Sequence, residues 1–165
     1  MRNPEEKFLV IYEKHSDAIF RHCYFRVSSK ELAENLTQET FMRAWKYLLE
    51  KEEIKNMKAL LYRIAGNLVI DYYRKKKESS LENMTEAGFQ IASNEDKEMK
   101  TATEIRGLMD KLDELEPKYS EVLIMRFIDD MRPREIAKVL DLKVNVVSVR
   151  IHRGVEKLKY IYVSS

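Results

Sequence analysis

The most regular pattern of apolar and polar positions lies over residues 56–77, NMKALLYRIAGNLVIDYYRKKK. Apolar side chains recur there at steps of three and four residues, the spacing of an amphipathic α-helix. We expect one stripe of this helix to face a core, and it consists of Leu60, Ile64, Leu68 and Tyr72. A polar series follows another side of the helix and comprises Arg63, Asn67, Asp71, Arg74 and Lys75.

The same spacing predicts further helices on both sides of this segment, so the expected fold class is all-α. Ser29 is placed to cap the helix that follows it, and Pro117 and Pro133 are placed in the first turns of two others. The expected helices cover residues 4–23, 30–50, 103–115, 117–128, 133–140 and 144–160. For the helix over 117–128 we expect an inner face made of Val122, Leu123, Met125, Phe127 and Ile128.

The last two helices are joined by the short turn Asp141-Leu142-Lys143, which together predict a helix-turn-helix motif. Asp141 stands where such turns usually carry Gly, and Asp is one of the residues that adopt the left-handed conformation. In this motif the N-terminal part of the second helix reads base edges in the major groove of DNA. The candidate DNA contacts are Lys143, Asn145, Val146, Ser148, Val149, Arg150 and Arg153. A helical hairpin that binds a protein is the alternative interpretation.

Composition supports a mostly helical chain, since 165 residues contain 44% hydrophobic and 35% charged positions but only 4 Gly and 3 Pro. The net charge of +2 hides an uneven distribution. Residues 1–77 carry 16 Lys/Arg against 11 Asp/Glu, residues 78–116 carry 4 against 11, and residues 117–165 carry 10 against 6. Two basic blocks around an acidic one predict two small helical domains, at 1–77 and 101–165, joined by a flexible acidic linker at 78–100.

The run Arg74–Lys77 at the end of the central helix has two interpretations. Cations in a last turn suit the helix dipole, which needs no ligand. Four bases beside two tyrosines also suit phosphates and unstacked bases. The presence of a second basic block with a helix-turn-helix motif favours nucleic acid.

Several kinds of chemistry have no support in the sequence. Cys23 is the single cysteine, so neither a disulfide framework nor a cysteine-based zinc site is expected. His15 and His22 lack neighbouring ligands, and we expect them to be structural or solvated. No phosphate-binding glycine loop or nucleophile–base pair is present, so we expect no enzyme, no metal and no cofactor. No signal-peptide core or membrane segment is recognisable, and we expect a cytoplasmic protein.

Two blocks of sequence, LTQETFMRAWKYL with LLYRIAGNLVIDYYRKKK, and EIAKVLDLKVNVVSVRIHRGVEKLK, resemble the extracytoplasmic-function (ECF) sigma factors of bacterial RNA polymerase. The resemblance covers about Phe8 to Lys159, with sigma region 2 first and region 4 second. It implies a promoter-specificity subunit that binds core polymerase and promoter DNA and initiates transcription. In this family an anti-sigma protein is a common partner.

The resemblance also implies residue roles. Core polymerase would be bound by Thr37, Gln38, Glu39, Phe41 and Arg43. The minus-ten element would be bound by Arg63, Asn67, Arg74, Lys75 and Lys76, and the minus-thirty-five element by the helix-turn-helix residues named above. Gly66 departs from the family, where a basic residue is usual at this position, and Asp141 and Lys143 replace the usual Gly and Ser of the turn. The alternative function is a stand-alone helix-turn-helix regulator that binds DNA without polymerase.

Overall fold

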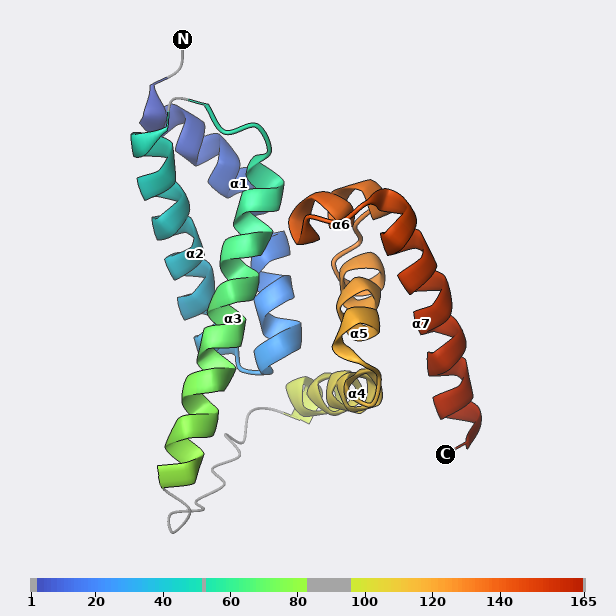
Figure 1. The fold of residues 1–165 in the computed structure, drawn as a ribbon. Coiled ribbons are helices and arrows are strands. Elements are labelled where there is room, and N and C mark those ends of the chain that lie inside the picture. Colours follow the sequence, from blue (N-terminus) through green and yellow to red (C-terminus); the bar gives the residue numbers. More distant parts are fainter. Residues whose placement is uncertain (1–2, 52, 83–95, 165) are drawn as a thin grey trace.

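The computed structural model describes residues 3–51, 53–82 and 96–164, and the described residues form helices and short connections without strands. Figure 1 shows two groups of helices, α1–α3 and α4–α7, that lie beside one another. The elements are α1 (Pro4–Val27), α2 (Lys30–Glu50), α3 (Met57–Glu82), α4 (Asp96–Asp113), α5 (Pro117–Leu123), the π-helix η1 (Ile124–Ile128), α6 (Pro133–Leu140) and α7 (Val144–Ser164).

Local capping residues set the ends of the first helices. Asn3 accepts a hydrogen bond from the backbone N–H of Glu6 at 2.8 Å, and Ser29 accepts one from Leu32 at 3.3 Å, which confirms Ser29 as an N-cap. Asn56 caps α3 in the same way, through the N–H of Ala59 at 3.0 Å. These side chains satisfy backbone donors that have no partner inside their helices.

The buried face of α3 is wider than the expected stripe, and its centre is different. Leu68 is buried as expected, but Leu60, Ile64 and Tyr72 are only half-buried. The most buried positions of α3 are Ala59, Leu61, Tyr62, Ala65, Leu68 and Val69. The reason is that α3 packs against α1, α2 and α6, so apolar side chains on more than one side of this helix find partners.

The second group of helices is built around α5, which ends in the π-helix η1. Val122, Leu123 and Met125 are buried as expected, but Phe127 is 64% exposed. A π-helical turn is wider than an α-helical one, so side chains in η1 point in directions that α-helical spacing does not predict. The inward placement of Phe127 is therefore wrong.

The helix-turn-helix motif is confirmed as α6, a short turn and α7. Pro133 is the first residue of α6, and Asp141 takes the left-handed conformation with φ 56° at its C-terminal end. Val147 is fully buried, and Ile151, Val155 and Leu158 pack partly buried on the same side of α7. The last helix continues to Ser164, four residues beyond the expected end at Tyr160.

Both helices that border the expected linker extend into it. α3 continues to Glu82, and α4 begins at Asp96 instead of Thr103. Residues 83–95, the remainder of the linker predicted at 78–100, lie outside the described residues.

Candidate polymerase and nucleic-acid interfaces

The exposed part of α2 contains three of the five residues expected to bind polymerase. Gln38 and Arg43 are exposed and Glu39 is partly exposed. Nε of Arg43 lies 3.1 Å from Oε1 of Glu39, one helical turn away. Because both side chains of this pair are about half exposed, it contributes little stability and remains available to another charged surface.

Two of the expected polymerase contacts lie inside the first helical group instead. Phe41 is 2% exposed, and its ring makes edge contacts with Phe8 and Tyr12 at centroid distances of 6.3 and 4.9 Å. Thr37 is also buried, and its hydroxyl donates to the carbonyl of Ala33 at 2.6 Å. As folded, these side chains have no open surface for a partner. They position α2 within the bundle.

The residues expected to bind the minus-ten element lie along the exposed side of α3, and all are exposed: Arg63, Asn67, Arg74, Lys75 and Lys76. Arg74 is held by Asp71, whose Oδ1 lies 2.8 Å from its Nη2, so Asp71 orients a neighbouring base as expected from the sequence. Nζ of Lys76 lies 5.9 Å from the centre of the Tyr72 ring. This arrangement presents cations beside aromatic faces, the combination that single-stranded nucleic acid requires.

Arg63 differs from the other four because its guanidinium is already occupied by the second group of helices. Its Nε donates to the carbonyl of Val139 at 3.0 Å, and its Nη2 donates to the carbonyl of Lys138. Both carbonyls belong to the last turn of α6, where they have no acceptor role inside the helix. Arg63 therefore caps the C-terminal end of α6, and it is favoured there by the helix dipole as well.

The candidate reading surface on α7 is open. Lys143, Asn145, Val146, Ser148, Val149 and Arg153 are exposed, and Arg150 is partly buried. A shallow cavity of about 290 Å³ lies at this surface, lined by Lys118, Tyr119, Asn145, Val146, Val149, Arg150 and Arg153. Lys143 and Ser148 are not among its lining residues. The cavity joins polar, apolar and cationic side chains within reach of one ligand surface.

Sequence reasoning missed Lys118 and Tyr119, which enter this surface from the start of α5. Tyr119 is held between two amines, with Nζ of Lys118 at 5.1 Å and Nζ of Lys157 at 5.4 Å from its ring centre. No local signal marks these residues, because only the packing of α5 on α7 brings them beside the motif.

Among the described residues, no group of three or more His, Cys, Asp or Glu side chains is arranged to hold a metal ion. Cys23 is buried, and burial raises the pKa of its thiol to about 11, with smaller opposing effects from Thr37 and Arg26. A thiol with this pKa stays protonated near neutral pH, so it is a poor nucleophile. Within the described residues, no helix combines the length and apolar character that crossing a membrane requires.

Both groups of helices match known protein families. Sigma-70 region 2 matches residues 11–79, and Sigma-70, region 4 matches residues 105–158. The chain is 30% identical to the ECF RNA polymerase sigma factor SigW of Bacillus subtilis (strain 168) over 168 residues, which cover 96% of this chain and 90% of SigW. It is also 30% identical to SigM of the same organism, over 92% of this chain and 93% of SigM.

A solved structure has the same fold. CnrH in complex with the cytosolic domain of CnrY matches 98% of this chain and 90% of CnrH, with a TM-score of 0.73 and 22% sequence identity. The family matches over both groups of helices and the two relatives at 30% identity lead to one conclusion. The chain belongs to the extracytoplasmic-function sigma factors of bacterial RNA polymerase, and it is a transcription initiation factor without enzymatic activity.

Proposed function

We propose that this sigma factor docks on core RNA polymerase through the exposed part of α2 and recognises a promoter with two separate surfaces. The division of labour follows the domain bounds expected from charge, with region 2 in residues 1–77, a connector in 78–100 and region 4 in 101–165. The observation that carries the proposal is the exposure of two basic surfaces, one on α3 and one on α7, in a chain of this family. Its site of action is the cytoplasm, where bacterial polymerase transcribes.

The polymerase contact consists of Gln38, Glu39 and Arg43. They form a polar surface on α2 whose charged groups pair only with one another at the surface. Thr37 and Phe41 support this surface from below, since both are buried under it. Their replacement would act on the position of α2 and not on a direct contact.

The minus-ten contact consists of Asn67, Arg74, Lys75 and Lys76 on α3, with Arg63 added when it is free. Single strands bind through cations along the backbone and through stacking of bases on aromatic rings. Tyr72 and Tyr73 lie in the same part of α3, with ring centroids 5.3 Å apart. An unstacked base of the melted promoter has a stacking partner here, which offsets the few kcal/mol that unstacking costs.

The minus-thirty-five contact is made by α7 in the major groove of duplex DNA. Arg150 and Asn145 have the side chains that pair with guanine and adenine edges, and Val146 and Val149 suit thymine methyl groups. Lys143, Ser148 and Arg153 lie at the margins of this surface and would contact phosphates or the neighbouring base. The partner of the free sigma factor is an anti-sigma protein, as in the complexes solved for CnrH with CnrY and for RpoE of Bartonella quintana with NepR.

The first test is size-exclusion chromatography of the purified protein mixed with core RNA polymerase that lacks a sigma subunit. Wild type should co-elute in a 1:1 complex, and Gln38→Ala/Glu39→Ala should weaken it. Glu13→Ala on the exposed side of α1 is the control, because it removes one surface carboxylate as well. A protein that elutes alone but still shifts duplex DNA would be a stand-alone regulator, the alternative that the sequence left open.

A further inference from the structure

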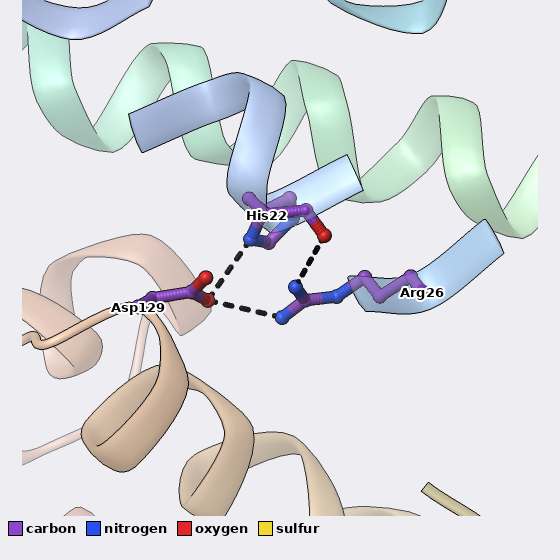
Figure 2. Close-up of polar contacts among 3 residues, drawn as sticks. All are labelled: His22, Arg26 and Asp129. Atoms are coloured by element: carbon purple, nitrogen blue, oxygen red, sulfur yellow. Dashed lines mark hydrogen bonds and ion pairs between the residues drawn. The ribbon is translucent and has the colours of Figure 1, made fainter. Parts of the chain in front are cut away.

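A buried ion-pair cluster joins the two groups of helices. Figure 2 shows Asp129, from the segment after η1, pointing at His22 and Arg26 of α1. Oδ2 of Asp129 lies 2.9 Å from Nδ1 of His22 and 3.0 Å from Nη2 of Arg26. The side chains of His22 and Asp129 are each 1% exposed, and that of Arg26 is 13% exposed. A single carboxylate therefore connects region 4 to two side chains of region 2.

The cluster is held in place on the α1 side. Arg26 uses its other terminal nitrogen to donate to the backbone carbonyl of His22 at 2.7 Å, so the guanidinium is fixed before Asp129 arrives. The His22 ring packs edge-on against Tyr62 of α3 at 5.0 Å. A preformed pair of donors of this kind loses little side-chain entropy when it binds the carboxylate.

Two further contacts lie where α6 crosses α3. Arg63 caps the C-terminal end of α6, as described above, and Nζ of Lys58 pairs with Oε2 of Glu135. Between these polar contacts the apolar cores of the two groups are continuous, with Ile136 and Met131 fully buried in the same cluster as Ile19 and Tyr62. In Figure 1, α6 accordingly lies against the middle of α3.

We propose that this arrangement is a self-inhibited state of the free sigma factor, in which the helix-turn-helix domain occupies part of the minus-ten surface and the His22–Arg26–Asp129 cluster is its latch. The inference rests on the proposed role of α3. Arg63 is the connection between the two, because its guanidinium serves α6 in the closed state and a DNA phosphate in the open one. Both cannot be satisfied together.

The polymerase surface on α2 stays open in this closed state, since Gln38 and Arg43 remain exposed. The closed sigma factor can therefore dock on core polymerase first, and the latch must open before α3 captures the non-template strand. This order would keep free sigma factor from binding single-stranded DNA elsewhere.

The latch is tested by Asp129→Asn in the full chain, with Asp130→Asn as the matched control. Both changes remove one carboxylate from adjacent positions, but Asp130 is exposed and takes the left-handed conformation that Asn also tolerates. A zero-length carbodiimide cross-link between Lys58 and Glu135, located by peptide mass spectrometry, reports the closed state. Asp129→Asn should lower the cross-linked fraction relative to the open form at least about tenfold, because it leaves Arg26 without its charge partner. Asp130→Asn should match wild type.

A second readout follows Arg63 itself without any DNA. Phenylglyoxal modification of Arg63 should be slow in wild type and in Asp130→Asn, and faster in Asp129→Asn. Lys58→Glu opens the interface from a different contact, and Lys58→Glu/Glu135→Lys should restore closure by exchanging the charges. If Asp129→Asn cross-links and reacts like wild type, or if wild type gives no Lys58–Glu135 cross-link, the latch does not exist.

The inhibitory role is tested by fluorescence anisotropy with a labelled single-stranded oligothymidylate. Asp129→Asn should bind it more tightly than wild type and Asp130→Asn by about tenfold, the same factor by which the latch shifts. Equal affinities alongside a reactive Arg63 would overturn the inhibitory role while leaving the latch. Failure of all variants to co-elute with core polymerase would instead contradict the proposed function, and the cross-linking result would be unaffected.

Discussion

Nδ1 of His22 lies 2.9 Å from Oδ2 of Asp129, although 107 residues separate them in the chain. An ionised carboxylate only accepts hydrogen bonds, so Nδ1 carries the proton and donates it. Nε2 of His22 and Oδ1 of Asp129, both buried, have no hydrogen-bond partner among the described residues. A second proton on the ring would therefore create a buried N–H group without an acceptor.

Burial and the nearby Arg26 lower the pKa of His22 to about 4, and Asp129 only partly opposes them. Opening the interface admits water and returns this pKa toward its ordinary 6.5. The open state therefore binds the proton more tightly. The closed state keeps its full stability above pH 6.5 and loses up to about 1.4 kcal/mol for each pH unit between 6.5 and 4.

We predict that acidification from pH 7.5 to 5 opens the sigma factor, measured as a rise in the radius of gyration by small-angle X-ray scattering. The charged groups that face His22 add nothing in this window: Arg26 stays charged, and the pKa of Asp129 is raised by burial but lowered more by His22 and Arg26, to below its ordinary value. Burial also raises the pKa of the neighbouring Tyr62, to about 12.

Two histidine variants separate the sources of this effect. His22→Asn keeps a donor near the Nδ1 position and does not titrate, so it should remove the response to pH. His15 needs its own control, because burial, Lys14 and Lys58 lower its pKa in the same direction. His15→Gln should keep the response. A response that survives in His22→Asn would assign it to another group.

A different pair of residues predicts opposite effects of the same substitution on stability. A methyl group added at Gly66, in α3, would meet nothing within 4 Å, whereas one at Gly154, in α7, would lie 3.1–3.3 Å from the side chain of Leu123. Gly66→Ala should raise the free energy of unfolding by up to about 1 kcal/mol through helix propensity alone. Gly154→Ala should gain less or lose stability, because Leu123 must move.

Urea unfolding followed by circular dichroism checks this pair, and each variant is compared with wild type at equal m-value. The comparison needs no DNA or polymerase, so it tests the packing of each domain directly. Equal stabilisation by both substitutions would show that Leu123 yields without cost and that α5 and α7 pack more loosely than the structure indicates.

The features that the sequence predicted correctly depend on nearby residues. Ser29, Pro117, Pro133 and Asp141 act on their own helix ends, so their positions could be inferred from capping and turn preferences alone. The helix-turn-helix motif follows from the same local rules. Motif spacing also located exposed basic residues on α3 and α7, which the structure places at the surface.

The features that it missed depend on contacts between distant segments. Phe41 and Thr37 belong to a sequence motif, and nothing local shows that α1 and α3 bury them. Asp129 was taken as a helix breaker, because its partners His22 and Arg26 are more than a hundred residues away. The occupation of Arg63 by α6 likewise requires knowledge of how the two domains pack.

Cys23 should be unreactive in the native protein. Its side chain is fully buried, and burial raises its pKa to about 11, so both access and thiolate formation are suppressed. We predict no reaction with Ellman's reagent at pH 8 over minutes, and release of one equivalent of chromophore in guanidinium chloride. Rapid reaction of the native protein would mean that α1 separates from the core on that timescale.

The two DNA surfaces should respond differently to loss of one cation each. Arg150 lies in the cavity on α7 among candidate base contacts, whereas Lys76 is exposed at the end of α3. In promoter complexes formed with core polymerase, Arg150→Ala should cost about 1–3 kcal/mol and relax preference at one base pair of the minus-thirty-five element. Lys76→Ala should weaken binding to all sequences and reduce the slope of log K against log salt by about 1. Binding measured over a salt series and a set of base substitutions separates the two. Sequence-independent losses of equal size in both variants would remove Arg150 from the reading surface and leave it as a phosphate contact.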